Sequence, residues 1–249
     1  MSVLKLGLAA ASAGLIGVGS LACADEPTWT GEGGLSAGMT TGNTETTDVG
    51  LALDIARETQ IWKAGLEAQA DFGKTDGVEN KNRFFLAGQL DRQMTDRMYG
   101  FGRLSYEEDQ FSGFDSRLFV GGGLGYEVLN SERTGWTLEG GPGLKIDETK
   151  PRTVDGVLLP AETTESVSVF GASNYAFQFN DNVSFSNDTD VLYAQESTQL
   201  VTVSALTAKL TDALSARISY DVRHDTDPPS GFESTDTATR VSLVYAIGG

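Results

Sequence analysis

The feature that most constrains the fold of this chain is an alternation of apolar and polar side chains with a period of two residues. The segment 62–72 shows it most clearly, with the alternating positions Trp62, Lys63, Leu66, Glu67, Asp71 and Phe72. Successive side chains of a β-strand point to opposite faces, so the pattern predicts strands with one apolar and one charged face. After residue 24 no stretch reaches the roughly eighteen consecutive apolar residues that a spanning helix needs.

Twelve such segments follow one another, joined by polar connections that alternate between short and long. The short ones are 130–135, 180–182 and 211–213, and the long ones are 73–82, 107–116, 148–165 and 225–236. Outer-membrane barrels combine short periplasmic turns, longer extracellular loops and strands of about ten residues. The sequence therefore predicts an all-β protein, a transmembrane antiparallel up-and-down β-barrel of about 12 strands. The alternative is a soluble β domain.

Three segments predict strands whose faces are ambiguous. In 98–106 both parities are apolar; in 183–193 the apolar face would include Asn187 and Thr189; in 199–210 the apolar parity slips between Val203 and Leu206. A bulge or a contact surface would explain the polar residues Asn187 and Thr189 on the apolar face. We expect strands at all three places but leave their register open.

The tryptophans orient the predicted barrel. Trp29, Trp62 and Trp136 all stand at the beginnings of odd-numbered strands and on the apolar face. An even number of strands places both termini on the periplasmic side, so these rings would form a girdle at the periplasmic interface.

Residues 1–24 fit a secretory signal peptide. Lys5 supplies the positive charge, residues 6–18 are apolar, and Ala22-Cys23-Ala24 is an A-x-A cleavage pattern before Asp25. Cleavage there would remove the single cysteine and leave residues 25–249 as the barrel domain. In the alternative, Cys23 is a lipid anchor, although the leucine usual three residues before such a cysteine is missing. The predicted localisation is the bacterial outer membrane, after export and cleavage.

The chain has 18 Lys and Arg against 35 Asp and Glu, a net charge of -17, which would become -18 on loss of Lys5. Such a surface repels nucleic-acid phosphates and favours cations. We expect no nucleic-acid partner. The expected partners are outer-membrane lipid and lipopolysaccharide, the barrel-assembly machinery during biogenesis, and small ions.

Several motifs resemble one family along most of the mature chain. They are Trp29-Thr30-Gly31, the hairpin Thr41-Gly42-Asn43-Thr44, the run Gly121-Gly122-Gly123-Leu124-Gly125-Tyr126, the strand Glu139-Gly140-Gly141-Pro142-Gly143, and Asp227-Pro228-Pro229. Together they resemble the DUF481 family, whose name refers to salt-induced outer-membrane proteins. The resemblance implies an outer-membrane barrel and no particular activity. One departure is the end, Tyr245-Ala246-Ile247-Gly248-Gly249, which lacks the terminal aromatic residue common in such barrels.

The polar parity of the strands predicts the lining of the lumen. The candidates are Asp54, Lys63, Glu67, Asp71, Arg83, Asp91, Arg117, Glu127, Glu139, Lys145, Arg217, Asp221, Arg223 and Arg240. Charges of both signs can pair across a small barrel and plug it, or can line a narrow aqueous path that selects ions. Both readings stay open.

Other chemistry finds little support in the sequence. Gly121 to Gly125 do not lie between a strand and a helix, so they predict wall packing instead of a phosphate loop. His224 would lie on the lipid face with Thr226 at the position of a lipase serine, without an orienting Asn. The loop acids Glu107, Glu108 and Asp225 lack calcium-loop spacing.

We therefore expect no cofactor, no metal and no enzyme. The leading hypothesis is a narrow, weakly cation-preferring passive channel. The alternatives are a non-conducting structural barrel that displays acidic extracellular loops, and a lipid-active outer-membrane enzyme.

Overall fold

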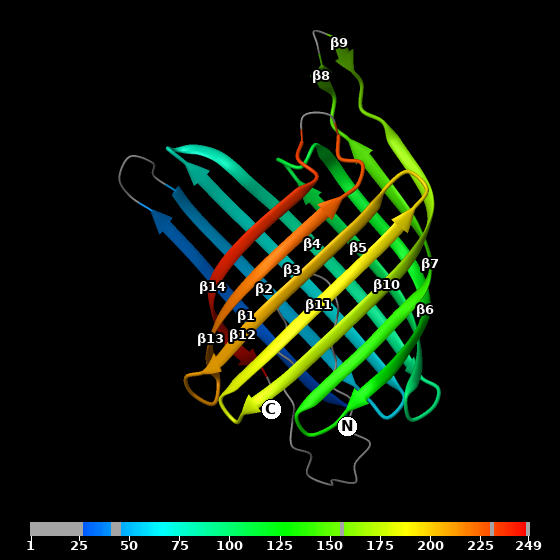
Figure 1. Cartoon of the computed structure of the whole chain (residues 1–249), viewed down its shortest axis with the longest axis vertical. Helices are drawn as coiled ribbons and strands as arrows, with labels where there is room; N and C mark the ends of the chain where they lie inside the picture. The colour runs from blue at the N-terminus through cyan, green and yellow to red at the C-terminus, as the bar shows by residue number, and fades with distance from the viewer. Residues whose placement is uncertain (1–26, 41–45, 155–156, 230–231, 248–249) are drawn as a thin grey trace.

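The computed structural model describes residues 27–40, 46–154, 157–229 and 232–247, and its body is a closed antiparallel barrel (Figure 1). Twelve strands form it in the order β1-β14-β13-β12-β11-β10-β7-β6-β5-β4-β3-β2. Their bounds are β1 Thr28–Thr40, β2 Thr46–Glu58, β3 Trp62–Thr75, β4 Val78–Gln93, β5 Met98–Asp109, β6 Phe114–Asn130, β7 Thr134–Thr149, β10 Thr163–Asn180, β11 Val183–Ala194, β12 Thr198–Lys209, β13 Leu214–Asp225 and β14 Thr235–Ile247. The pairing of β1 with both β2 and β14 closes the sheet, which confirms the predicted fold class.

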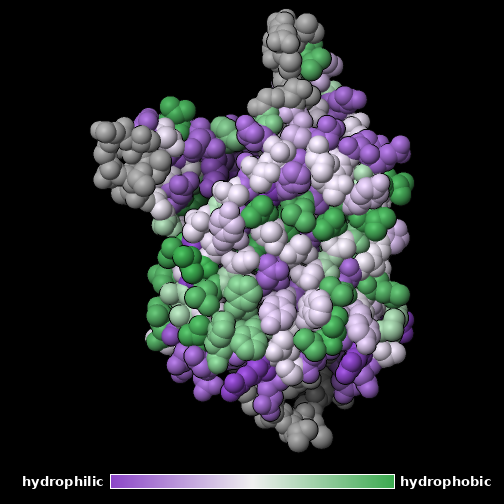
Figure 2. All heavy atoms as spheres, viewed as in Figure 1, coloured by the Kyte–Doolittle hydropathy of each residue, from purple (hydrophilic) through white to green (hydrophobic). Residues whose placement is uncertain are grey.

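The burial of side chains is the reverse of that in a soluble β domain. Leu124 on the outer face is 51% exposed, whereas Glu67 on the inner face is 0% exposed. Figure 2 shows hydrophobic side chains as a belt over the middle of the visible face, between hydrophilic rims. Since only a lipid environment favours an apolar exterior around a charged interior, the two-residue alternation is the signature of a membrane barrel.

The two ends of the barrel differ in their connections. β1 begins and β14 ends at the same end of the barrel, the near end, where residues 59–61, 94–97, 131–133, 181–182 and 210–213 make short turns (Figure 1). At the distal end the connection from β7 to β10 carries a small hairpin, β8 (Arg152–Val154) with β9 (Val157–Leu159). The connection from β13 to β14 is also long, so these two long loops were predicted correctly.

Two predicted long loops are wrong. In 73–82 the strands β3 and β4 continue to a tight hairpin at Asp76 and Gly77, whose φ angles are 49° and 77°. Positive φ at both central residues is the geometry of a type I′ turn, for which Asp-Gly is a strong sequence signal. In 107–116 only residues 110–113 separate β5 from β6, so Glu107 belongs to a strand.

The ambiguous segments are regular strands. In β5, Tyr99 and Phe101 face the interior, while Leu104 is 53% exposed on the outside. In β11, Asn187 and Thr189 do lie on the outer face, where Asn187 donates hydrogen bonds to Thr202 and Ser204 of β12 at 3.2 and 3.0 Å. These polar side chains satisfy one another within the outer face, so no bulge is needed there.

The parity slip around 199–210 is also no bulge. The register of β12 against both neighbours is continuous, so Val203 faces the interior and Leu206 the outside. The sequence misleads here because the lumen accepts apolar side chains as well as charged ones. A real bulge occurs in β6 between Glu127 and Leu129.

Glycines make room for aromatic rings inside the barrel. A Cβ at Gly125 would meet the ring of Tyr99, and one at Gly121 or Gly143 would meet the ring of Phe119. At Gly123 a Cβ would instead meet the backbone of Gly140, because β6 and β7 approach closely there. The glycine-rich run thus packs the wall, as the sequence predicts.

Within the described ranges, no helix is long and apolar enough to span a bilayer. The predicted signal peptide, residues 1–24, and the Thr41–Thr44 hairpin motif lie outside those ranges.

Candidate functional site

The candidate site is the lumen, and the structure places every predicted lining residue on the inner face of its strand. Most are buried, namely Glu67, Asp71, Arg83, Asp91, Glu127, Glu139, Lys145, Arg217 and Asp221. The others are partly exposed to the interior space, namely Asp54, Lys63, Arg117, Arg223 and Arg240. Glu107, Asp188 and Asp190 also face inward, although the sequence did not predict them as lining residues.

The buried charges are unbalanced. Nine carboxylates are buried in the described barrel, on Glu67, Asp71, Asp91, Glu127, Glu139, Asp147, Asp188, Asp190 and Asp221. Four cationic side chains accompany them, those of Arg83, Arg103, Lys145 and Arg217. Burial of a charge is costly unless the charge is paired, so the lumen has a net attraction for positive charge.

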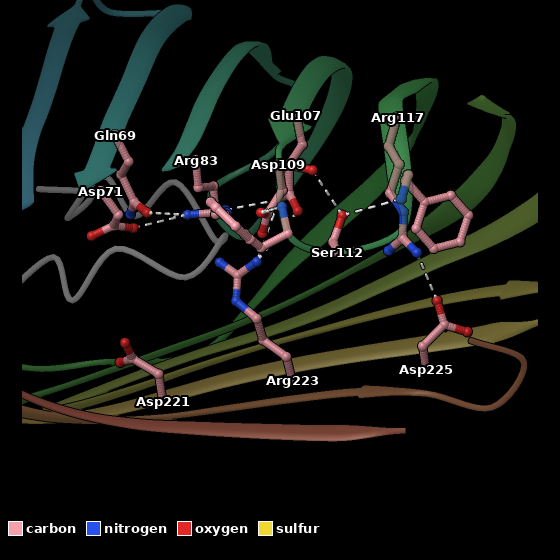
Figure 3. A network of polar contacts seen from close by, with 12 residues as sticks. Gln69, Asp71, Arg83, Glu107, Asp109, Ser112, Arg117, Asp221, Arg223 and Asp225 are labelled. Carbon is pink, nitrogen blue, oxygen red and sulfur yellow. Dashed lines mark hydrogen bonds and ion pairs between the residues drawn. The ribbon is translucent and has the colours of Figure 1, made fainter. Parts of the chain in front are cut away.

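An ion-pair network crosses the lumen at the distal end (Figure 3). Arg83 of β4 lies 2.8 Å from Glu107 of β5, and Arg223 of β13 lies 3.4 Å from the same carboxylate. β5 and β13 stand on opposite sides of the barrel, six strands apart in its order. Glu107, expected as a solvated loop acid, is therefore the bridge between two walls.

Further ion pairs join side chains of other strands inside the lumen. Arg117 of β6 reaches Asp225 of β13 at 3.0 Å, so Asp225 is another predicted loop acid that faces a lumen cation. Arg240 of β14 lies 3.6 Å from Asp71 and 3.3 Å from Asp221. The distal half of the lumen is thus constricted by side chains that span it.

An aromatic layer lies beside this network, and sequence reasoning missed it. Tyr99, Phe101, Phe119 and Phe170 form a buried cluster inside the barrel, with Phe119 and Phe170 at 5.6 Å between ring centroids. Arg103 holds its guanidinium carbon 5.5 Å from the centre of the Phe170 ring. The available signal was the pairing of these inward aromatic positions with glycines on the facing strands.

Below the aromatic layer, carboxylates meet neutral donors. Glu139 accepts hydrogen bonds from Tyr99 (2.8 Å) and Gln89 (3.0 Å), and Gln89 in turn accepts one from Arg103 (3.0 Å). Glu67 accepts one from Gln69 at 3.2 Å through Oε1, while no described residue hydrogen-bonds to its Oε2.

The described part of the lumen contains a larger, distal cavity and a smaller one. The distal cavity, of about 220 Å³, lies among Glu107, Phe119, Phe170, Asp190 and the β13–β14 connection. A smaller one, of about 60 Å³, lies between Asp54, Arg217 and Arg240. The cross-lumen side chains narrow the space between them.

At the distal rim, outside the membrane span, Glu196 accepts a hydrogen bond from Ser166 at 2.7 Å, which lowers the pKa of this carboxyl. Among the described residues no group of three His, Cys, Asp or Glu side chains has metal-binding geometry.

The tryptophans lie on the outer face at the near end. Trp29 is 57% and Trp62 42% exposed, and Trp136 donates a hydrogen bond to Ser173 at 3.1 Å. Arg57 and Arg92 stack near the rings of Trp29 and Trp62 at 5.8 and 5.7 Å. This arrangement is typical of an interfacial girdle.

His224 does not pair with Thr226. Its Nδ1 lies 2.8 Å from Thr235 Oγ1, whereas the Thr226 hydroxyl accepts a hydrogen bond from the Thr198 backbone at 2.8 Å. Over the described residues no carboxylate or amide side chain hydrogen-bonds to the imidazole, so a lipase-like triad is not assembled here.

Residues 33–247 match the family described as "Protein of unknown function, DUF481". The chain belongs to the DUF481 family. The match covers nearly the whole barrel, including the glycine-rich motifs, and confirms the family resemblance seen in the sequence. The chain is 28% identical over 222 residues to the uncharacterized protein YdiY of Escherichia coli (strain K12), covering 87% of this chain and 83% of YdiY.

Solved structures resemble this DUF481 protein in fold. The translocator domain of the autotransporter NalP from Neisseria meningitidis aligns with a TM-score of 0.50 at 13% identity, over 88% of this chain and 87% of that domain. The COG4313 outer membrane channel from Pseudomonas putida F1 aligns with a TM-score of 0.49 at 10% identity, over 88% and 94% of the two chains. The likeness to the NalP domain establishes an outer-membrane β-barrel fold and nothing about activity.

Proposed function

We propose that this DUF481 protein is a narrow, weakly cation-preferring passive channel of the outer membrane, with a lumen that is constricted at rest. The observation that carries the proposal is the excess of buried carboxylates over cations along the lumen. Fixed charge of one sign raises the local concentration of the opposite ion and sets the selectivity of a narrow pore.

Unpaired acceptor atoms support a hydrated path. Oε2 of Glu67 and Oδ2 of Asp54 are buried and accept no hydrogen bond from the described residues. Groups of this kind normally bind water or a cation. Where carboxylates face lumenal cations, as in the Arg240 pairs, the attraction is neutralised, so the preference is modest.

The second candidate is a non-conducting structural barrel, and the cross-lumen pairs favour it. Arg223–Glu107 and Arg117–Asp225 connect distant strands and fill the distal lumen. If these pairs never open, the protein contributes a closed barrel and acidic loops to the envelope.

The test is ion conductance of the refolded mature chain in planar bilayers. We expect small unitary conductance, and a reversal potential across a KCl gradient that indicates cation preference and weakens as salt screens the lumen. Anion preference would contradict the charge argument. Absence of conductance at every voltage tested would favour the second candidate, the non-conducting structural barrel.

A matched pair of variants locates the selectivity. Neutralising Asp54, Glu67 and Asp71 together should shift the reversal potential toward zero, because all three face the lumen. Neutralising Glu108, which follows the lumenal Glu107 and is exposed, should leave the reversal potential unchanged. Equal shifts would show that the loop surface, and not the lumen, selects ions.

This proposal involves no catalysis and no cofactor. Its partners are lipid and lipopolysaccharide around the barrel, the assembly machinery during insertion, and the permeant ions. The tryptophan girdle at the near end, where β1 begins and β14 ends, fits a periplasmic orientation of that end.

A further inference from the structure

The distal cavity is acidic, aromatic and only partly closed. Its lining carries seven carboxylates, Asp147 and Asp190 among them, against the three cations Arg117, Lys145 and Arg223. Six phenylalanines line it too: Phe85, Phe111, Phe114, Phe119, Phe170 and Phe232. At about 220 Å³, the cavity has room for a small organic molecule.

One buried carboxylate in the cavity lacks a hydrogen-bonding partner altogether. Asp190 of β11 is 6% exposed, and neither Oδ1 nor Oδ2 accepts a hydrogen bond from the described residues. Asp147 of β7, 7% exposed, is paired with Lys145 through Oδ2 at 2.8 Å but has no described partner for Oδ1. Buried carboxylate oxygens normally accept a hydrogen bond or contact a cation, so a ligand that supplies either would stabilise these atoms.

The protein's own cations do not meet that demand. Arg103 interacts electrostatically with Asp190, but the same guanidinium also serves Glu67, Asp91 and Glu139. No ion pair within 4.0 Å joins Asp190 to a cation in the described part of the chain. The excess of carboxylates over cations around Asp190 therefore favours binding of an additional positive charge in the cavity.

The aromatic rings define what kind of cation fits. Phe119 and Phe170 pack at 5.6 Å, and the negative faces of such rings attract ammonium groups while their bodies accept apolar substituents. Guanidinium groups of the protein already lie over three rings of the lining, Phe170 among them: Arg83 lies 5.3 Å from the centre of Phe85, Arg117 3.4 Å from that of Phe114, and Arg103 5.5 Å from that of Phe170. Rings that line the cavity thus already face delocalised cations of the protein itself.

We propose that the distal cavity is a binding site for a small organic cation, an ammonium group held beside Asp190 with its apolar substituents against Phe119 and Phe170. The inference goes beyond the channel proposal, because binding at the distal end requires no passage of ions through the constriction. A barrel that conducts nothing can bind such a cation, and a conducting barrel can lack the site.

The experiment compares two probes of nearly equal shape on the refolded mature chain in detergent micelles. Choline chloride carries the positive charge, and 3,3-dimethyl-1-butanol is its neutral isostere. By isothermal titration we expect choline to bind with a Kd of about 1 mM and the alcohol at least about tenfold more weakly. Equal affinity of the two probes, or no saturable choline binding up to about 100 mM, would overturn the proposal.

Variants assign the site. Asp190→Asn should weaken choline binding about tenfold, since it removes the unpaired charge and keeps the shape. Asp188→Asn is the matched control, because Asp188 is the preceding inward carboxylate of β11, is 1% exposed, and is not part of the cavity lining; it should change affinity by less than about threefold. Equal losses of choline affinity in both variants would show that the general negative charge of the lumen attracts choline, and would refute the assignment to Asp190.

A second variant tests the proposal independently if Asp190→Asn fails to fold. Phe119→Leu keeps an apolar side chain but removes the ring, so it should lower the preference for choline over the alcohol by about threefold or more. Sodium chloride should compete only weakly with choline. Displacement by sodium at equal concentration would show a simple carboxylate site and overturn the aromatic part of the inference.

Discussion

Removal of the Glu107 carboxylate is the sharpest perturbation that the structure offers. Glu107→Gln keeps the side-chain length and deletes the charge that joins Arg83 of one wall to Arg223 of the opposite wall. Arg83 is 5% exposed, so its guanidinium cannot move into water when its partner is lost. The variant therefore leaves a buried, partly uncompensated cation.

The expected loss of unfolding free energy follows from the distances between the Glu107 carboxylate and the two guanidinium groups. At 2.8 and 3.4 Å and an effective dielectric constant of about 20, the two attractions are about 6 and 5 kcal/mol before desolvation is subtracted. Breaking a buried pair by removal of one partner usually costs about 3–5 kcal/mol. Because Arg83 keeps Gln69 at 3.1 Å and Asp71 at 3.5 Å, we expect the lower end, about 3 kcal/mol of unfolding free energy.

The assay is urea unfolding in lipid vesicles, followed by tryptophan fluorescence. Glu108→Gln is the control, since Glu108 is adjacent and exposed, and it should change the free energy of unfolding by less than about 0.5 kcal/mol. A loss for Glu107→Gln that equals the control would refute a cross-lumen role for this carboxylate. In bilayers the same variant should also shift selectivity toward anions, because Arg223 then faces the path with less compensation.

Three further predictions concern the barrel wall and the N-terminus. Leu124→Arg, in the middle of an outer face, should cost about 2–4 kcal/mol of unfolding free energy in vesicles, whereas lumenal Glu67→Gln should leave folding intact; equal losses would mean that the two faces are misassigned. Gly123→Ala should destabilise by about 1–3 kcal/mol because its Cβ meets the adjacent backbone, while Gly102→Ala, whose Cβ meets nothing within 4 Å, should not, as equilibrium unfolding will show. Mass spectrometry of the exported protein should find Asp25 at the mature N-terminus, and a lipid-modified Cys23 would contradict the cleavage site.

Local side-chain pattern was sufficient for much of the architecture. Because β-strands have a strict period of two, the sequence determined the number of barrel strands, their apolar and charged faces, and the position of all three tryptophans at one end. It also contained the Asp76-Gly77 turn signal, which outweighs the polar composition of the residues around it.

Tertiary structure decided what the lumenal side chains do. Period two tells that Glu107 and Arg223 face inward once their strands are known, but not that strands β5 and β13 stand opposite each other, because strand count and stagger are properties of the closed sheet. The aromatic layer could not be predicted from the strand pattern for a related reason. The ring of Phe119 fits inside the barrel only because Gly121 and Gly143 leave space for it. The sequence alone determined a membrane barrel with an acidic interior; closure decided which of those charges pair across the lumen and which, like Asp190, stay without a hydrogen-bonding partner among the described residues.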